Sequence, residues 1–80
     1  MKKMKIEFDS HVKKYILRLQ SKEQKRILNA VYKLPAGDTK PLQGRADDFR
    51  LRVGDWRVIF VYRDDVIFIK EIGNRGDIYK

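Results

Sequence analysis

The chain has 80 residues, with 19 lysines and arginines against 11 aspartates and glutamates, a formal net charge of +8, and no cysteine. This length predicts one domain, residues 1–80, and the absence of cysteine excludes disulfides and thiolate metal sites. Because His11 is the single histidine, we expect no metal and no cofactor. An ordinary apolar core must therefore hold the fold.

The positive charge favours a polyanionic partner, with nucleic acid first, although basicity that serves only solubility is the alternative. Residues 1–40 contain nine lysines and two arginines against four acids, a net +7, whereas residues 41–80 contain two lysines and six arginines against seven acids, a net +1. Lysine supplies diffuse charge, and arginine is suited to bidentate phosphate contacts. The first half therefore predicts a surface with diffuse positive charge. The second half predicts arginines that make defined contacts.

No apolar run reaches the roughly 18 residues that a membrane helix needs. The basic N-terminus begins like a signal peptide, but Glu7 and Asp9 interrupt any apolar segment that would follow. We expect a cytoplasmic protein with no membrane partner.

The first half of the chain predicts a strand and two helices. Residues 5–8 alternate as a short strand, and Asp9 or Ser10 is the candidate N-cap of a helix. Its apolar positions recur at helical spacing: Val12, Tyr15, Ile16 and Leu19.

Ser21-x-x-Gln24 predicts a capping box at the start of a second helix. Pro35 ends this helix, and its apolar stripe is Ile27, Ala30, Val31 and Leu34. Because one or two residues separate the two helices, we expect an antiparallel helical hairpin.

The second half predicts a loop followed by three strands. Residues 35–48 form the longest loop, and residues 49–53 then alternate, with Arg50 and Arg52 on one face. After a turn at Gly54, residues 56–62 are apolar except for Arg57, which is typical of a central strand. Residues 66–72 form the last long strand. The aromatic side chains expected in the core are Trp56, Phe60 and Phe68.

These elements predict an α+β fold of the order β-α-α-β-β-β, in which an antiparallel sheet has the helical hairpin on one face. The open face would then display Arg50 and Arg52, with Arg57 beside them on the neighbouring strand. A charged side chain in an apolar strand needs a partner or an open groove. The structural alternative for Arg57 is an ion pair with Asp55 or Glu71.

Residues 49–60 (FRLRVGDWRVIF) and residues 72–79 (IGNRGDIY) carry a resemblance to a known family. Together with the chain length and the element order, they resemble the RelE/ParE superfamily of toxins from type II toxin–antitoxin pairs. The resemblance covers nearly the whole chain. It implies a compact antiparallel sheet backed by a helical hairpin.

In the RelE branch, the resemblance implies a toxin that enters the ribosomal A site and cuts mRNA, with inhibition of translation as the result. The implied reaction is attack of a ribose 2′-OH on the adjacent phosphorus, which leaves a cyclic phosphate and a 5′-OH and needs no metal. The implied partners are the ribosome, mRNA and an acidic antitoxin protein. The residues that match the family's working positions are Arg50, Arg52, Arg57, Arg75 and Tyr79.

The candidate set contains no lysine or histidine, and arginine is a poor general base at neutral pH. Tyr79 or the ribosomal RNA would then take the proton. Two other functions stay open: a ParE-like inhibitor of DNA gyrase, and a non-catalytic RNA-binding module. Tyr79 has an alternative role as a core anchor, and Asp77 either orients Arg75 or belongs to a turn. His11 is expected at the surface, without a local partner.

Overall fold

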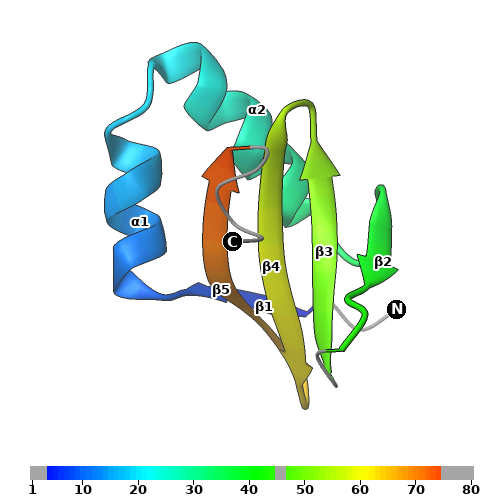
Figure 1. Cartoon of the computed structure of the whole chain (residues 1–80). Coiled ribbons are helices and arrows are strands. Elements are labelled where there is room, and N and C mark those ends of the chain that lie inside the picture. The colour runs from blue at the N-terminus through cyan, green and yellow to red at the C-terminus, as the bar shows by residue number, and fades with distance from the viewer. Residues whose placement is uncertain (1–3, 45–46, 75–80) are drawn as a thin grey trace.

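The computed structural model describes residues 4–44 and 47–74. Their elements follow in the order β1 (Lys5–Phe8), α1 (Ser10–Leu17), α2 (Ser21–Tyr32), β2 (Thr39–Pro41), β3 (Asp48–Val53), β4 (Trp56–Arg63) and β5 (Val66–Asn74). The strands form one five-stranded sheet in the order β1-β5-β4-β3-β2, and both helices cover the same face of it (Figure 1). No helix of the described part combines the length and apolar character that a membrane span requires.

The predicted α+β class is confirmed, with two differences in the sheet. First, β1 pairs with β5 in parallel, whereas the other neighbouring strands are antiparallel. The sheet is therefore mixed rather than antiparallel, because the β3-β4-β5 meander returns the chain to the edge where β1 lies. Second, Thr39–Pro41 pairs with β3 inside the segment predicted as a loop. Pro41 fits there because an edge strand leaves one side of its backbone unpaired.

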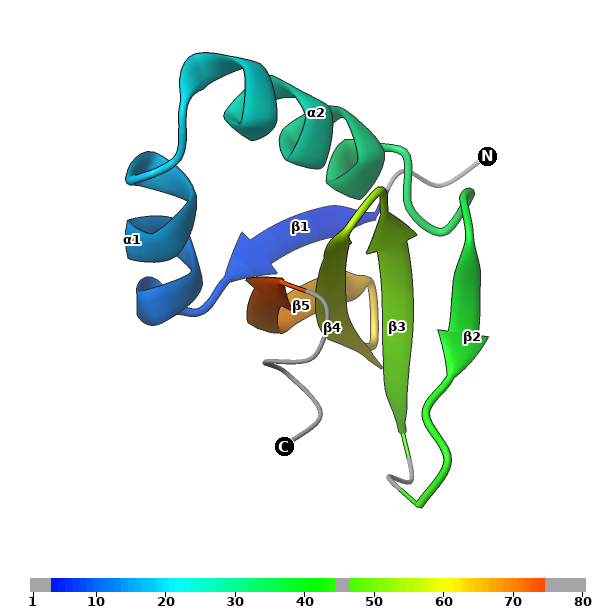
Figure 2. The same cartoon turned by 45° about the horizontal axis from the view of Figure 1, so that its top comes forward.

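The helices differ from the predicted hairpin. The helix α1 packs mainly on β5 and α2 on β3, so the two helices spread apart across the sheet (Figure 2). The predicted capping box is wrong, because Gln20 is the N-cap of α2 and makes no side-chain cap bond. The side-chain amide of Gln24 instead donates to the carbonyl oxygens of Leu17 and Leu19, at 3.2 and 2.9 Å. Gln24 thereby ties the start of α2 to the end of α1.

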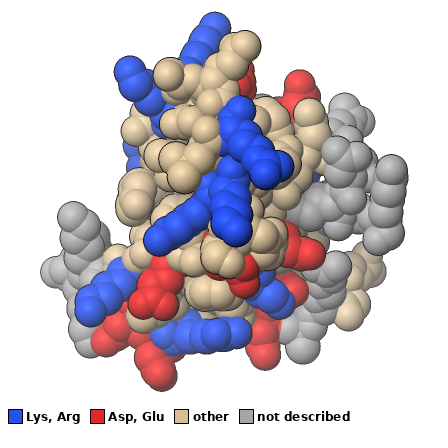
Figure 3. All heavy atoms as spheres, turned by 90° about the vertical axis from the view of Figure 1, so that its left-hand side faces the viewer, with Lys and Arg blue, Asp and Glu red and all other residues tan. Residues whose placement is uncertain are grey.

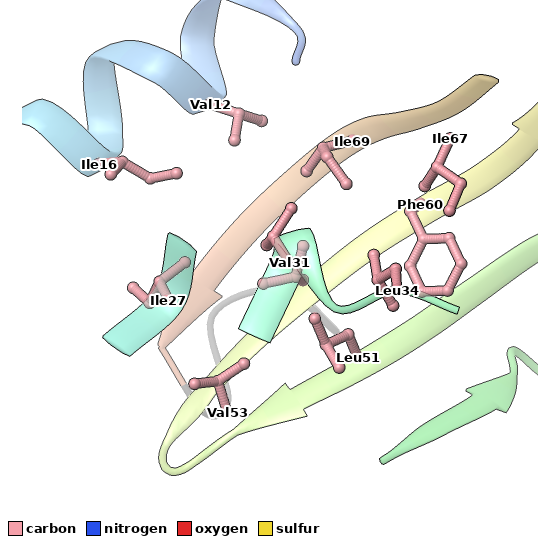
Figure 4. Packing of buried hydrophobic residues seen from close by; sticks show 11 residues of the cluster. Val12, Ile16, Ile27, Val31, Leu34, Leu51, Val53, Phe60, Ile67 and Ile69 are labelled. Atoms are coloured by element: carbon pink, nitrogen blue, oxygen red, sulfur yellow. The ribbon is translucent and has the colours of Figure 1, made fainter. Parts of the chain in front are cut away.

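The core lies between the helices and the sheet, as Figure 4 shows. Phe60 is fully buried there. Five of the predicted apolar positions of the helices are buried in it: Val12, Ile16, Ile27, Val31 and Leu34. Leu19 and Ala30 are partly buried against it, whereas Tyr15 contacts the ring of Trp56 edge to face. Trp56 is half-buried at the edge of the core, and its indole N–H donates to Glu23 at 3.1 Å. The side chains that form the cluster are Val12, Ile16, Ile27, Val31, Leu34, Leu51, Val53, Val58, Phe60, Ile67 and Ile69.

Phe68 does not belong to this core, so that prediction was wrong. Ile67 and Ile69 face the helices, and successive side chains of a strand point to opposite faces. Phe68 therefore lies half-buried on the open face, where the guanidinium of Arg63 stands 5.0 Å from its ring centroid.

A bulge in β5 changes which face of the sheet its following side chains occupy. Ile59 pairs with Glu71 and Phe60 with Ile69, so Lys70 is the extra residue. This allows Ile69 and Ile72, three residues apart, both to pack with the core. It also directs Lys70 to the open face, where its Nζ lies 2.9 and 3.0 Å from the two carboxylate oxygens of Asp48.

Candidate nucleic-acid interface

Three of the predicted site residues share the open face of the sheet. Arg52 on β3 pairs directly with Arg57 on β4, and Arg50 pairs with Ile59 one step along. Their neighbours in sequence, Leu51 and Val58, point into the core, so the arginines project away from the helices. The predicted placement of these arginines is therefore confirmed, while their role stays a prediction.

Arg57 is buried, with 8% of its surface exposed. Its Nη1 donates to the carbonyl oxygens of Gly54 at 3.3 Å and of Trp56 at 3.2 Å. Among the described residues, the alternative ion pair with Asp55 or Glu71 does not form, and these two carbonyls are the hydrogen-bond partners of Arg57. A guanidinium has five N–H donors, and both of these hydrogen bonds come from Nη1. Burial also strengthens its field, because water screens it less.

Of the three arginines, only Arg52 is exposed. The side chain of Arg50 is 13% exposed, and its Nη2 lies 3.6 Å from an oxygen of Asp38. Arg52 is exposed, and its backbone N–H donates to the carbonyl of Asp38 at 3.0 Å. On the edge strand, Lys40 pairs with Arg50 and extends the row of cations. Sequence reasoning missed Lys40, because it assigned residues 35–48 to a loop.

The remaining predicted site residues, Arg75 and Tyr79, lie outside the described residues, as does Asp77. Their placement beside the open face stays a prediction.

A depression of about 510 Å³ lies between the start of α1 and the strands β3 and β5. His11 Nδ1 lies 2.6 Å from the carboxylate of Asp9, so the expectation that His11 has no local partner was wrong. Because an ionised carboxylate only accepts, Nδ1 donates in this contact. The lining residues are Asp9, His11, Asp48, Phe68, Lys70 and Glu71.

Asp9 is also the N-cap of α1, as predicted. The backbone N–H of His11 donates to its carboxylate at 3.2 Å. That hydrogen bond, followed by the one from the imidazole, holds the pKa of Asp9 below its ordinary value of 3.8. The depression thus contains a histidine and a lysine, the two residue types that the arginine set lacks.

The position of Lys70 on the open face could have been predicted from the sequence Ile69-Lys70-Glu71-Ile72. Two polar residues between core isoleucines indicate a bulge.

The lysine-rich half forms a further basic surface. Figure 3 shows the side of the molecule that carries α1, where lysines and arginines predominate in the upper and middle part, while most acidic residues lie lower down among further cations. Exposed cations of the two helices include Lys13, Lys14, Arg18, Lys22, Lys25 and Arg26. This is the diffuse field expected from the charge of residues 1–40.

Neither protein-family models nor curated proteins match this sequence. Solved structures do match it along nearly its whole length. RelE in the RelE–RelB complex of Pyrococcus horikoshii OT3 is 26% identical, with a TM-score of 0.74, and 95% of this chain and 99% of that chain are covered. The RelB–RelE antitoxin–toxin complex of Methanococcus jannaschii matches at 22% identity and a TM-score of 0.73, over 91% of this chain and 94% of that one. The DinJ–YafQ toxin–antitoxin complex of E. coli matches at 20% identity and a TM-score of 0.67, over 99% and 100% of the two chains.

These matches confirm the resemblance that the two sequence segments carry. The chain has the fold of a RelE-like toxin, with the sheet, the two helices and the short edge strand in one compact unit.

Proposed function

We propose that this protein is the toxin of a type II toxin–antitoxin pair and acts in the cytoplasm as a ribosome-dependent mRNA endoribonuclease. The observation that carries the proposal is the set of Arg50, Arg52 and Arg57 on the open face of a RelE-like fold. Guanidinium groups gathered on one face are suited to bind RNA phosphates.

The proposed reaction is transesterification of the RNA backbone without a metal. A ribose 2′-OH attacks the adjacent phosphorus, the O2′–P bond forms, and the P–O5′ bond breaks. The products are a cyclic phosphate and a 5′-OH. Negative charge develops on the non-bridging oxygens of the phosphorane, so donors that are already in place lower the barrier.

The arginines have distinct parts in this proposal. Arg57 is held by the carbonyls of Gly54 and Trp56, so its guanidinium needs no reorganisation to face a phosphate. Arg50 and Arg52 bind the same or the neighbouring phosphate and hold the 2′-OH in line with the leaving oxygen. Arg75 completes the set, and Tyr79 or the ribosomal RNA accepts the 2′-OH proton. The 5′-oxygen takes up a proton as it leaves, which gives the 5′-OH.

The partners proposed are the ribosome with its mRNA, and an acidic antitoxin. Support for the antitoxin comes from the complexes in which the similar RelE and YafQ chains were solved, where RelB or DinJ is present. The net charge of +8 makes an acidic polypeptide a suitable inhibitor, because it would neutralise the basic surface.

Translating ribosomes provide the direct test. We expect the wild-type chain to produce new mRNA 5′ ends within the A-site codon, mapped by primer extension, and Arg52→Ala to abolish them. Lys14→Ala removes an exposed charge from α1 and serves as the matched control. Absence of cuts together with inhibition of DNA gyrase would replace the proposal with a ParE-like function. Tight binding of RNA whose length does not change would instead indicate a non-catalytic module.

A further inference from the structure

The turn between β3 and β4 is covered by a guanidinium from a helix. Gly54 has a φ of +59°, and a Cβ built on it would lie 2.7 Å from Nη2, 2.9 Å from Cζ and 3.1 Å from Nη1 of Arg26. The whole guanidinium group therefore lies over Gly54, and a side chain at this position would require the exposed Arg26 side chain to shift. Glycine serves two purposes here, since it also adopts the left-handed backbone without strain.

Two further arginines meet at this turn. Arg57 Nη1 donates to the Gly54 carbonyl at 3.3 Å, and Arg52 stands opposite Arg57 in the β3–β4 register. Like charges that face each other across a sheet are destabilising. In the part of the chain that the structure describes, no carboxylate lies within ion-pair distance of Arg26, Arg52 or Arg57. The nearby acid Asp38 faces Arg50 instead, at 3.6 Å.

A groove of about 300 Å³ leads from this cluster along the seam between α2 and β3. Arg26, Asn29 and Lys33 line it from one side of the seam, and Arg52 lines it from β3. The cations are exposed, so a ligand can reach them. Asp38 also belongs to the lining, but its carboxylate faces Arg50 at 3.6 Å. Arg26 on α2 and Lys33 at its C-cap are therefore the charged side chains that this helix brings to the groove.

We infer that this groove is a phosphate-binding subsite, in which Arg26 and Lys33 hold the backbone of an RNA strand that continues from the arginines of the open face. Asn29 supplies an amide donor, and β3 links the two regions, because it lines the groove at Arg52 and directs the side chain of Arg52 to the open face. The inference rests on the proposed function in taking RNA as the polyanion. Such contacts position the strand and carry no base specificity. Arg26 is therefore a positioning residue rather than a catalytic one.

Equilibrium binding as a function of salt tests the subsite without reference to cleavage. The probe is a fluorescent single-stranded oligouridylate, bound to the full-length chain over a range of KCl concentrations. We expect Arg26→Gln to weaken binding several-fold. The slope of log K against log salt should fall by about 0.7, the value for loss of one phosphate contact in a single strand. Lys14→Gln removes the same charge from α1 and should leave the slope unchanged.

Arg26→Lys provides the second variant, since it keeps the charge but loses the planar fork over Gly54. We expect it to retain the wild-type salt slope with reduced affinity, and thermal unfolding should show that all three variants keep the fold. Equal effects of Arg26→Gln and Lys14→Gln on the slope would overturn the subsite while leaving the cleavage proposal intact. An Arg26-dependent slope in a chain that never cuts mRNA would support the subsite and remove the nuclease. A wild-type chain that does not bind the RNA would overturn the subsite outright.

Discussion

Arg52 and Arg57 face each other across β3 and β4, yet the fold exposes the first and buries the second. Both β3 and β4 are interior strands of the sheet, so the difference arises at the side chains. The guanidinium of Arg57 turns back onto the β3–β4 turn, where it donates to the carbonyls of Gly54 and Trp56. Arg57 is therefore fixed before any ligand arrives, whereas Arg52 keeps its rotamer freedom. The buried Arg57 can provide a preorganised donor to a phosphate, and the exposed Arg52 can close onto the same phosphate after it binds.

Replacing Arg57 by methionine should separate chemistry from folding. Loss of one preorganised donor to a developing oxyanion costs about 10²–10³ in rate, and we expect a loss of mRNA cleavage of that size on translating ribosomes. The free energy of unfolding should change by less than about 1.5 kcal/mol, because methionine fills a similar volume and the cost of burying a charge disappears. Urea denaturation measures the second quantity. Full cleavage by the variant would exclude Arg57 from the site.

The identity of the proton acceptor can be tested on two residues. Positioned acid–base groups contribute about 10²–10⁴ in rate, so Tyr79→Phe should lower cleavage by that factor if the phenol takes the 2′-OH proton. His11→Gln is the comparison, and we expect a change of less than about twofold, since His11 is held by Asp9 at the margin of the open face. The pH–rate profile of each variant is the measurement. A larger effect of His11→Gln would move the acid–base role into the depression beside α1.

The packing of α2 on the sheet depends on Ile27, which is fully buried. Truncation to alanine removes apolar contacts and leaves a cavity, at a cost of about 2–5 kcal/mol. Domains of this size have a stability of about 4–12 kcal/mol, so Ile27→Ala should lower the urea midpoint strongly. Leu17, 72% exposed on α1, provides the control, since its truncation should change stability by less than about 0.5 kcal/mol. Equal midpoints for the two variants would contradict the described core.

The start of α1 should be sensitive to acid through Asp9. Its pKa is lowered in the folded state by the hydrogen bonds from His11, so its contribution is present above the ordinary value of 3.8 and is lost as the pH falls through the folded-state value. Asp9→Ala should therefore be less stable than the wild type at pH 7, and the difference should shrink below pH 3.8. Thermal unfolding at the two pH values measures this. A difference that is independent of pH would show that the carboxylate charge contributes nothing.

Gly54 should tolerate substitution less well than Gly44, although both have positive φ angles. A left-handed backbone costs a non-glycine residue about 1–2 kcal/mol, and Gly54→Ala must in addition displace Arg26. A Cβ on Gly44 meets nothing within 4 Å, so Gly44→Ala isolates the backbone cost. In urea denaturation we expect Gly54→Ala to lose more stability than Gly44→Ala. Arg26→Ala should remove most of that excess in the double variant, and an unchanged excess would place the strain elsewhere.

Local periodicity accounts for the parts of the fold that could be predicted. The alternation of residues 49–53 predicted that Arg50 and Arg52 share a face, and the helical spacing of Ile27, Val31 and Leu34 predicted their burial. Both are confirmed by the register and the core. The predictions failed where a contact between more distant parts of the chain overrode the local sequence pattern. Gln24 donates hydrogen bonds to the end of α1 instead of capping its own helix. Because Ile67 and Ile69 face the core, the side chain of Phe68 between them points to the open face.

The sequence by itself thus determined the α+β class, the strand and helix periods, and the gathering of arginines on one side of a sheet, because each depends on residues only a few positions apart. Tertiary structure alone decided which strands pair, so it made β1 parallel to β5 and added β2 at the far edge. It also decided that Arg57 is buried while Arg52 is exposed, and that Arg26 lies over Gly54. These outcomes depend on contacts between residues distant in the chain, whose geometry follows from how the helices pack on the sheet and not from any local pattern.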